Sequence, residues 1–273
     1  MDLTLPQRLY LLIFNLDKNK LDSASALVRG QLMRAGAMAE LTIAGLLGDQ
    51  DGKVSRDATA PPPGDPFLAE VFDDVSPDKP RSWFRLVDRN WHKAEATVRD
   101  QLEAAGTVTV TRGRMLGVFP TRRIALGDPR QVAALRENTR NAVLLGRDPA
   151  TLPIEDAVVA VLAADGDLYS VFTPKERRAH KPALTALRDH VDATLPGLRK
   201  AAGRALAAYL AAEQELGRVD KDADPAAAAG LLLGACLERA FLGHFIDAAD
   251  ARPSVDQFAT SLIRTLGGGL APR

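Results

Sequence analysis

The stretch LEAAGTVTVTRGRMLGVF, residues 102–119, contains the change of periodicity that decides the fold class. The helical spacing of apolar residues that leads into it ends at Gly106. Threonine and valine then alternate from Thr107 to Thr111, which is the period of a half-buried strand. Gly113 suits a tight turn, and the residues after it form a second short apolar run. The sequence therefore predicts one prominent β-hairpin at about 107–119.

Most of the remaining chain has apolar residues at helical spacing. We expect helices at or around residues 5–16, 23–47, 83–86, 98–105, 135–145 and 154–164. A further helix should begin at Thr173, because Thr173 to Glu176 forms a capping box with proline at the first helical position. Gly48 to Gly52 predicts a turn, and the proline-rich residues 60–66 predict a surface loop. The predicted fold class is therefore mainly α.

The C-terminal part shows a second group of helical patterns. Residues 198–216 end at Gly217, Asp224 with Pro225 begins a run to about 247, and a capping box at Ser254 precedes the last run. We expect antiparallel helices here. The predicted domains are a helical domain at 1–190 and a C-terminal helical segment at 195–270.

The charge balance excludes a global electrostatic field. The 273 residues include 35 basic and 35 acidic side chains, for a net charge of +0. Any binding of anions must therefore depend on a local patch, and nucleic acid is an improbable partner. The single cysteine, Cys236, lies in an apolar run, and neither a leader peptide nor a membrane-spanning stretch is recognisable. These features predict a cytoplasmic protein.

No motif for catalysis or metal binding stands out. The four histidines do not form a local motif with serine or cysteine, and metal-ligand spacings and glycine-rich phosphate loops are absent. These histidines are His92, His180, His190 and His244. Asp73 and Asp74 lie in a loop-like stretch and are predicted to be solvated surface residues. We expect a non-enzymatic protein without metal or cofactor.

Arginines gather around the predicted hairpin. Residues 107–125 contain no acidic side chain. The basic residues in or beside the hairpin are Arg112, Arg114, Arg122 and Arg123. Guanidinium groups bind phosphate through paired hydrogen bonds, and apolar side chains at a hairpin tip can enter a headgroup layer. The alternative is an ordinary hairpin whose arginines keep an edge strand soluble.

The N-terminal residues Leu3 to Leu5 and the segment QLMRAGAMAEL, residues 31–41, resemble the Golgi phosphoprotein family. In that family an arginine stands six residues before a glutamate-leucine pair, and Arg34 stands in this relation to Glu40 and Leu41. The resemblance covers about residues 1–190. It implies a mostly helical fold with a hairpin, binding of phosphatidylinositol 4-phosphate, peripheral membrane attachment, and an adaptor role for enzymes with short cytoplasmic tails.

The resemblance also implies a headgroup pocket, of which Arg34 is the clearest match. The family's pocket further uses a tryptophan nine residues before this arginine and a basic pair on the helix before the hairpin. This chain has Ser25 at the first position, and His92 and Glu95 at or near the pair. Glutamate repels phosphate, so Arg99, Arg112 and Arg114 are the available substitutes. The partner is then an anionic lipid headgroup or an acidic protein segment.

The segment from about residue 198 weakly resembles the dimerisation helices of tetracycline-repressor-type regulators. That resemblance implies a homodimer. Two hypotheses follow. The first is a peripheral membrane adaptor that binds phosphoinositide or other anionic lipid through Arg34 and the hairpin arginines. The alternative is a ligand-sensing, DNA-binding transcriptional regulator that dimerises through its C-terminal helices.

Overall fold

The computed structural model describes residues 3–22, 25, 28–115, 119–196 and 220. The chain divides into two compact units, Met1–Leu198 and Arg199–Arg273. The first unit is mainly helical, as predicted. The predicted C-terminal helices and Cys236 lie outside the described residues.

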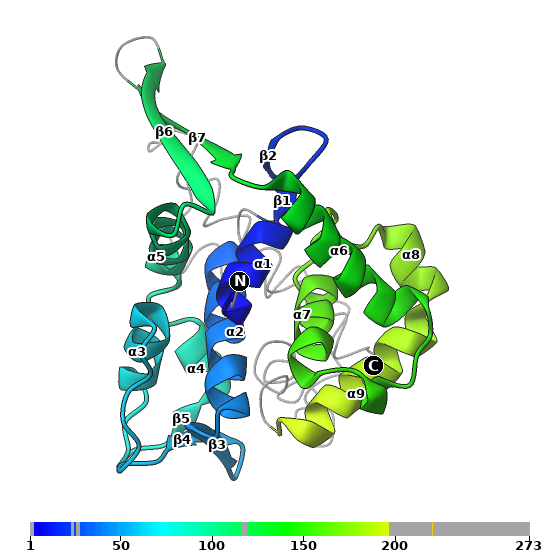
Figure 1. Ribbon diagram of the computed structural model, residues 1–273. Helices are drawn as coiled ribbons and strands as arrows, with labels where there is room; N and C mark the ends of the chain where they lie inside the picture. Colours follow the sequence, from blue (N-terminus) through cyan, green and yellow to red (C-terminus); the bar gives the residue numbers. More distant parts are fainter. Residues whose placement is uncertain (1–2, 23–24, 26–27, 116–118, 197–219, 221–273) are drawn as a thin grey trace. The chain divides into compact units, whose positions relative to one another are not determined.

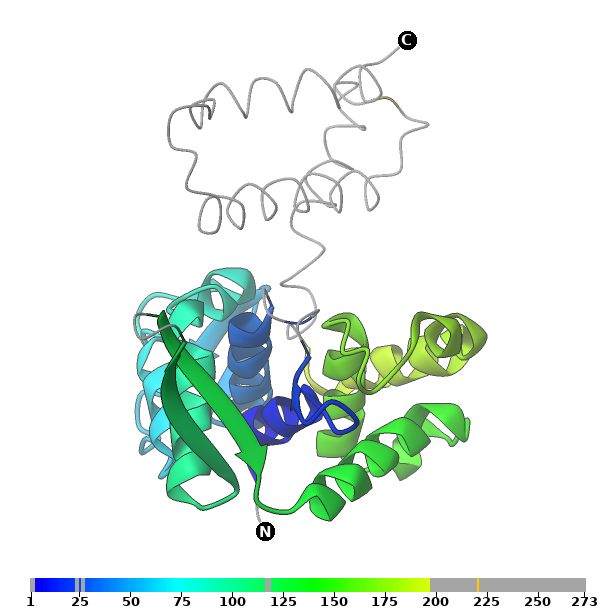
Figure 2. The ribbon, with the colours of Figure 1, turned by 90° about the horizontal axis from the view of Figure 1, so that it is seen from above.

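Helix α1 (Leu5–Leu12) lies at the centre of the first unit. It packs against α2 (Arg29–Ile43), α5 (Trp91–Ala104), α6 (Pro129–Leu144) and α7 (Ile154–Asp165). Figure 2 shows the helices of the first half on one side of α1 and the later, green and yellow helices on the other. Six of its eight residues are buried, and the two that are partly exposed are Gln7 and Arg8.

Two side-chain oxygens, on Gln7 and Glu40, accept backbone N–H groups at the start of α1. Thr4 and Gln7 form a capping box, and the backbone N–H of Leu5 donates to Oε2 of Glu40 on α2 at 2.6 Å. Burial raises the pKa of the Glu40 carboxyl, because desolvation disfavours its charge. Glu40 thus joins the N-terminus of α1 to the neighbouring helix.

The predicted helix at 5–16 is shorter in the structure. It ends at Leu12, and β1 (Phe14–Asn15) pairs with β2 (Lys20–Leu21) in a small antiparallel sheet. The predicted helical region at 23–47 likewise contains α2 and then the first residue of β3. Helical spacing of leucines therefore placed these helices correctly but overestimated their lengths.

A three-stranded sheet lies at the C-terminal end of α2. Its strands are β3 (Leu47–Gln50), β4 (Lys53–Arg56) and β5 (Arg81–Ser82), in the order β3-β4-β5. The predicted turn is confirmed as the β3–β4 turn, where Asp51 and Gly52 have φ of 52° and 78°. The sheet was not predicted, because its last strand is two residues long and distant in sequence.

Two helices follow the β3–β4 pair in the chain. Helix α3 (Pro66–Asp73) begins after Asp65, whose carboxylate accepts the N–H groups of Phe67 and Leu68. Helix α4 (Trp83–Val87) carries the buried Trp83, whose Nε1 donates to Asp49 at 2.6 Å. Trp83 is thus a core residue.

The main hairpin consists of β6 (Val108–Met115) and β7 (Phe119–Leu126). Its first strand is where the alternation of threonine and valine predicts it. The predicted turn at Gly113 is wrong, because Gly113 lies inside β6 and pairs with Thr121. The hairpin is therefore longer than 107–119, and Figures 1 and 2 show it as a two-stranded arm.

The later helices form the second side of the unit. Helix α6 leads through a 3-10 helix (Pro149–Thr151) to the buried α7, and α8 (Pro174–Ala179) and α9 (Lys181–Thr194) follow. The capping box of Thr173 and Glu176 at the start of α8 is confirmed. Most residues of α7 from Ala157 to Ala164 are buried.

Candidate anion-binding surface

The arginines of the hairpin are brought together by its register. Arg112 on β6 pairs with Arg122 on β7, and the neighbouring pair is Thr111 with Arg123. Arg114 pairs with Pro120, one pair beyond Gly113 and Thr121. Four of the predicted site residues therefore lie within a short length of one two-stranded ladder.

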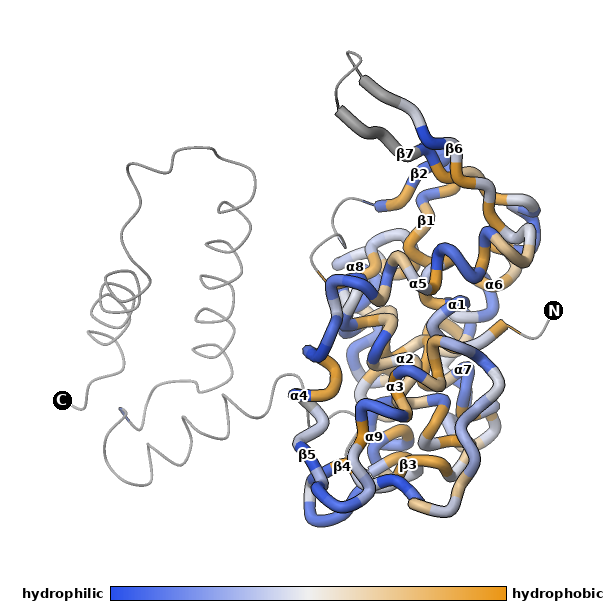
Figure 3. The backbone as a smooth tube through the Cα atoms, turned by 90° about the vertical axis from the view of Figure 1, so that its left-hand side faces the viewer, coloured by the Kyte–Doolittle hydropathy of each residue, from blue (hydrophilic) through white to orange (hydrophobic). Residues whose placement is uncertain are grey.

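The base of the hairpin is firmly attached to the helical body. Gly106 adopts φ of 70° after α5, and the N–H of Thr107 donates to the carbonyl of Leu102. Val108 and Val110 are buried. In Figure 3 the base of β6 is hydrophobic and the strand becomes hydrophilic further along the arm. The basic residues are thus held away from the core by an apolar anchor.

The described hairpin arginines keep most of their charge available. Arg112 is 63% exposed and donates to Glu103 at the end of α5 at 3.2 Å. An exposed pair of this kind contributes only about 0–1 kcal/mol. Arg123 is exposed and makes no ion pair with any described residue. The base of the arm therefore presents guanidinium groups that a phosphate is able to approach.

Arg34 does not join this group. Its side chain has 0% exposure, its Nη2 donates to Asp74 at 2.8 Å, and its Nε donates to the carbonyl of Leu86 at 2.7 Å. Arg89 donates to the second oxygen of Asp74 at 2.5 Å. Arg34 therefore links α2 to the end of α3 and to α4. A headgroup contact by Arg34 stays a prediction, and it requires this buried cluster to open.

The same cluster corrects the prediction for the acidic pair. Asp73 is 70% exposed, as expected, whereas the side chain of Asp74 is only 10% exposed. Asp74 accepts from two arginines that lie far from it in the sequence. The Nη1 atom of Arg34 is buried without a partner among the described residues, which costs about 1–3 kcal/mol if no water reaches it.

Comparison with known families shows which family the chain belongs to. The family model described as Golgi phosphoprotein 3 (GPP34) matches residues 5–208. The chain belongs to the Golgi phosphoprotein 3 family. A search of curated proteins finds no match. Within the residues that the structure describes, no helix is long and apolar enough to cross a bilayer, and acidic, histidine and cysteine side chains form no group suited to a metal ion.

Where the resemblance implies a headgroup pocket, this chain has an internal ion pair. Ser25 is buried, and its Oγ donates to the carbonyl of Asp22 and accepts from Nε of Arg29. Arg29 also faces the carboxylate of Glu95 on α5 at 3.8 Å. Glu95 is thus neutralised by Arg29. His92 is exposed and lies edge-to-face with Trp91.

Two further residues, Tyr10 and Arg99, complete this region. We call it the α1–α2–α5 cluster, and it consists of Tyr10, Ser25, Arg29, Glu95 and Arg99. The pKa of Tyr10 is raised, chiefly by burial and further by the charge of Glu95. Its hydroxyl is buried without a hydrogen-bond partner in the described part of the chain. Arg99 is buried and donates from Nε and Nη2 to Asp100.

Sequence reasoning did not identify Arg29 or Tyr10. Arg29 stands one helical turn after Ser25, so a search for basic residues near that position would have found it. Tyr10 carries no local signal, since it reaches the cluster only because α1 packs against α2 and α5. The structure therefore adds a partly neutralised cluster to the exposed arginines of the hairpin.

Proposed function

We propose that this member of the Golgi phosphoprotein 3 family is a non-enzymatic, peripheral membrane adaptor that contacts anionic lipid through its β6–β7 arm. The observation that carries the proposal is the register of the hairpin, which gathers Arg112, Arg122 and Arg123 at two neighbouring pairs of the ladder. Family membership supports the adaptor-like role. The site of action is the cytoplasmic face of a membrane.

The arm carries exposed positive charge on Arg112 and Arg123. Guanidinium groups bind phosphate oxygens through charge-assisted hydrogen bonds. Each basic side chain close to an anionic bilayer contributes about 1 kcal/mol of attraction. These arginines should therefore draw the arm to an anionic lipid surface.

The α1–α2–α5 cluster determines how selective this binding is. Arg29 is paired with Glu95, and Arg99 is paired with its neighbour Asp100. The cationic groups of the cluster are thus already neutralised, whereas Arg123 is not. We expect the arm to contribute most of the affinity for anionic lipid and the cluster to contribute any preference for phosphatidylinositol 4-phosphate.

Co-sedimentation with vesicles tests the proposal. The vesicles contain neutral lipid alone, neutral lipid with phosphatidylserine, or neutral lipid with phosphatidylinositol 4-phosphate. The double variant Arg112→Glu/Arg123→Glu should bind anionic vesicles at least about tenfold more weakly, from about 1 kcal/mol for each basic residue near the surface. Raised salt should weaken binding by the wild-type protein.

The matched control is Lys175→Glu/Arg178→Glu. It changes the net charge by the same amount at two exposed positions of α8. Retained binding by this control and lost binding by the hairpin variant support the proposal. Equal losses in both variants would mean that net charge, and not the arm, governs binding. Unchanged binding by the hairpin variant excludes the arm as the lipid contact.

The DNA-binding alternative gains no support from the family match. Homodimerisation through the C-terminal helices stays a prediction, since those helices lie outside the described residues. Light scattering on the full chain tests it. A mass of 29.3 kDa, that of one chain, would contradict the dimer.

A further inference from the structure

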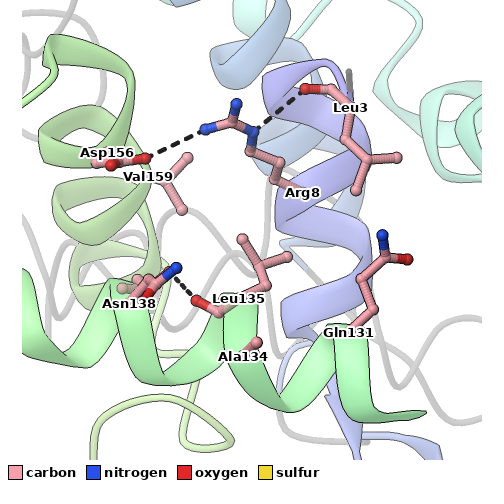
Figure 4. A pocket seen from close by; sticks show the side chains of 9 residues that line it. Leu3, Arg8, Gln131, Ala134, Leu135, Asn138, Asp156 and Val159 are labelled. Atoms are coloured by element: carbon pink, nitrogen blue, oxygen red, sulfur yellow. Dashed lines mark hydrogen bonds and ion pairs between the residues drawn. The ribbon is translucent and has the colours of Figure 1, made fainter. Parts of the chain in front are cut away.

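Two cavities lie along one side of α6, the helix that follows the hairpin in the chain. The first, of about 340 Å³, lies between α1, α6 and α7 (Figure 4). The second, of about 330 Å³, lies between α6, the residues that follow it, and the start of α7. Asn138 and Asp156 line both, so the two cavities are adjacent, and we call them together the α6 groove. Ligand sites commonly occupy about 300–1,000 Å³.

Carboxamides lie along the α6 side of this groove. Gln131, Asn138 and Asn141 are separated by seven and three residues, which places them on one face of the helix. A carboxamide has an N–H donor and a C=O acceptor, the same pair that a peptide group presents. A series of carboxamides along a helix is therefore suited to hydrogen-bond the backbone of an extended peptide.

The same face of α6 ends in an exposed apolar residue. Leu145 follows Asn141 by four residues and Asn138 by seven, and it is 54% exposed. The buried stripe of α6, which includes Val132 and Val143, lies to one side of this face. Leu145 is therefore available to an apolar side chain of a ligand that follows the carboxamides.

The charges of the α6 groove favour an acidic ligand. Its lining includes two arginines, Arg8 and Arg147, and one aspartate, Asp156. Arg8 donates to Asp156 at 3.2 Å and to the carbonyl of Leu3. Arg147 is exposed and makes no ion pair with any described residue. The neighbouring Asp148 carboxylate accepts the N–H of Ala150.

We propose that the α6 groove binds an extended peptide segment of a partner protein that carries an acidic side chain. The carboxamides bind the peptide backbone, Arg147 binds the acidic side chain, and Leu145 contacts an apolar one. This proposal rests on the proposed adaptor function and supplies its protein-binding site, which is separate from the lipid-binding arm.

Nuclear magnetic resonance on the full, isotope-labelled chain tests the proposal. The probe is an acetylated and amidated heptapeptide, LASAEAS, and the comparison peptide has lysine in place of glutamate. We expect the glutamate peptide to shift the side-chain amide signals of Asn138 and Asn141, and the lysine peptide to bind several-fold more weakly. No shift with either peptide overturns the proposal.

Three variants make the result specific. Asn138→Leu should abolish peptide binding, whereas Gln50→Leu, which removes an exposed carboxamide from β3, should not. Arg147→Glu should reverse the preference toward the lysine peptide. Peptide binding that persists in Asn138→Leu, or a preference unchanged in Arg147→Glu, overturns the proposal.

Vesicle binding by the same variants separates the two proposals. Asn138→Leu and Arg147→Glu should sediment with anionic vesicles like the wild-type protein, because neither residue lies on the arm. Wild-type vesicle binding without peptide binding overturns the groove alone. Peptide binding without vesicle binding overturns the lipid proposal alone.

Discussion

Arg34 and Asp74, forty residues apart in the sequence, form an ion pair of 2.8 Å in which the arginine has lost all contact with solvent. The arginine for which the resemblance implies a headgroup contact thus has a structural role in this chain. The pair joins α2 to the end of α3, and Leu86 extends it to α4. The stability of the first unit should depend on it.

The variant Asp74→Asn tests this dependence. It leaves the Arg34 charge buried without its carboxylate, and such losses cost about 3–5 kcal/mol. We expect the free energy of unfolding, measured with urea at neutral pH, to fall by about 3 kcal/mol or more. Asp73→Asn is the control, since Asp73 is 70% exposed and, among the described residues, pairs with Arg56 alone. Equal effects of the two variants would contradict the structural role.

Gly30 sets the distance between α2 and α5. A Cβ atom at this position would lie 2.0 Å from the carbonyl oxygen of Trp91. Gly30→Ala should therefore destabilise the protein by about 2 kcal/mol or more, although alanine gains about 1 kcal/mol of helix propensity. Gly64→Ala is the control, because nothing lies within 4 Å of its added Cβ. Calorimetry should show a lower Tm for the first variant only.

Glu176 should make the protein sensitive to acid. Its hydrogen bonds with Arg140 lower the pKa of the carboxyl from 4.5 to about 2. A lowered pKa contributes stability above pH 4.5, and this contribution is lost as the pH falls toward 2. Glu176→Gln should therefore be less stable than the wild type at neutral pH, and the difference should disappear through that range. Urea unfolding at several pH values measures it.

An exposed carboxylate provides the comparison for Glu176. Asp88→Asn lies on the surface between α4 and α5 and should change the unfolding free energy by no more than about 0.5 kcal/mol at any pH. A pH-independent difference for Glu176→Gln would mean that its carboxylate is not held by Arg140.

The pair of Arg29 and Glu95 limits the charge of the α1–α2–α5 cluster. Glu95→Gln should release Arg29 and so raise the affinity for vesicles with phosphatidylinositol 4-phosphate. The gain should be about fivefold at most, because a partly exposed ion pair contributes about 0.2–1 kcal/mol. Vesicles with phosphatidylserine are the comparison. An equal gain with both lipids would show that Arg29 adds charge without selectivity, and no gain would exclude the cluster from lipid binding.

Local signals in the sequence predicted local structure well. The capping box at Thr173, the glycine that ends α5 and the alternation from Thr107 all lie where the structure confirms them. The turn of the hairpin was misplaced, because Gly113 is as acceptable within a strand as in a turn. The second strand was not predicted to continue past Phe119, because Pro120 follows and proline is uncommon in strands.

The candidate site was predictable only in part. The hairpin arginines are close in sequence, so their register followed once the hairpin was recognised. The burial of Arg34 was not predictable, because its acceptors on Asp74 and Leu86 are distant in the sequence. The α6 groove was missed for the same reason, since α1 and α7 supply its other side.

The central place of α1 has a consequence for biosynthesis. Arg8 pairs with Asp156, and the carbonyl of Leu12 accepts from Ser170, so partners of the first helix are made about 150 residues later. At about 5–20 residues per second, the side of α1 that contacts the later helices waits roughly 8 to 30 s for them on the ribosome. An apolar helix face that stays uncovered so long is a natural ligand for a nascent-chain chaperone.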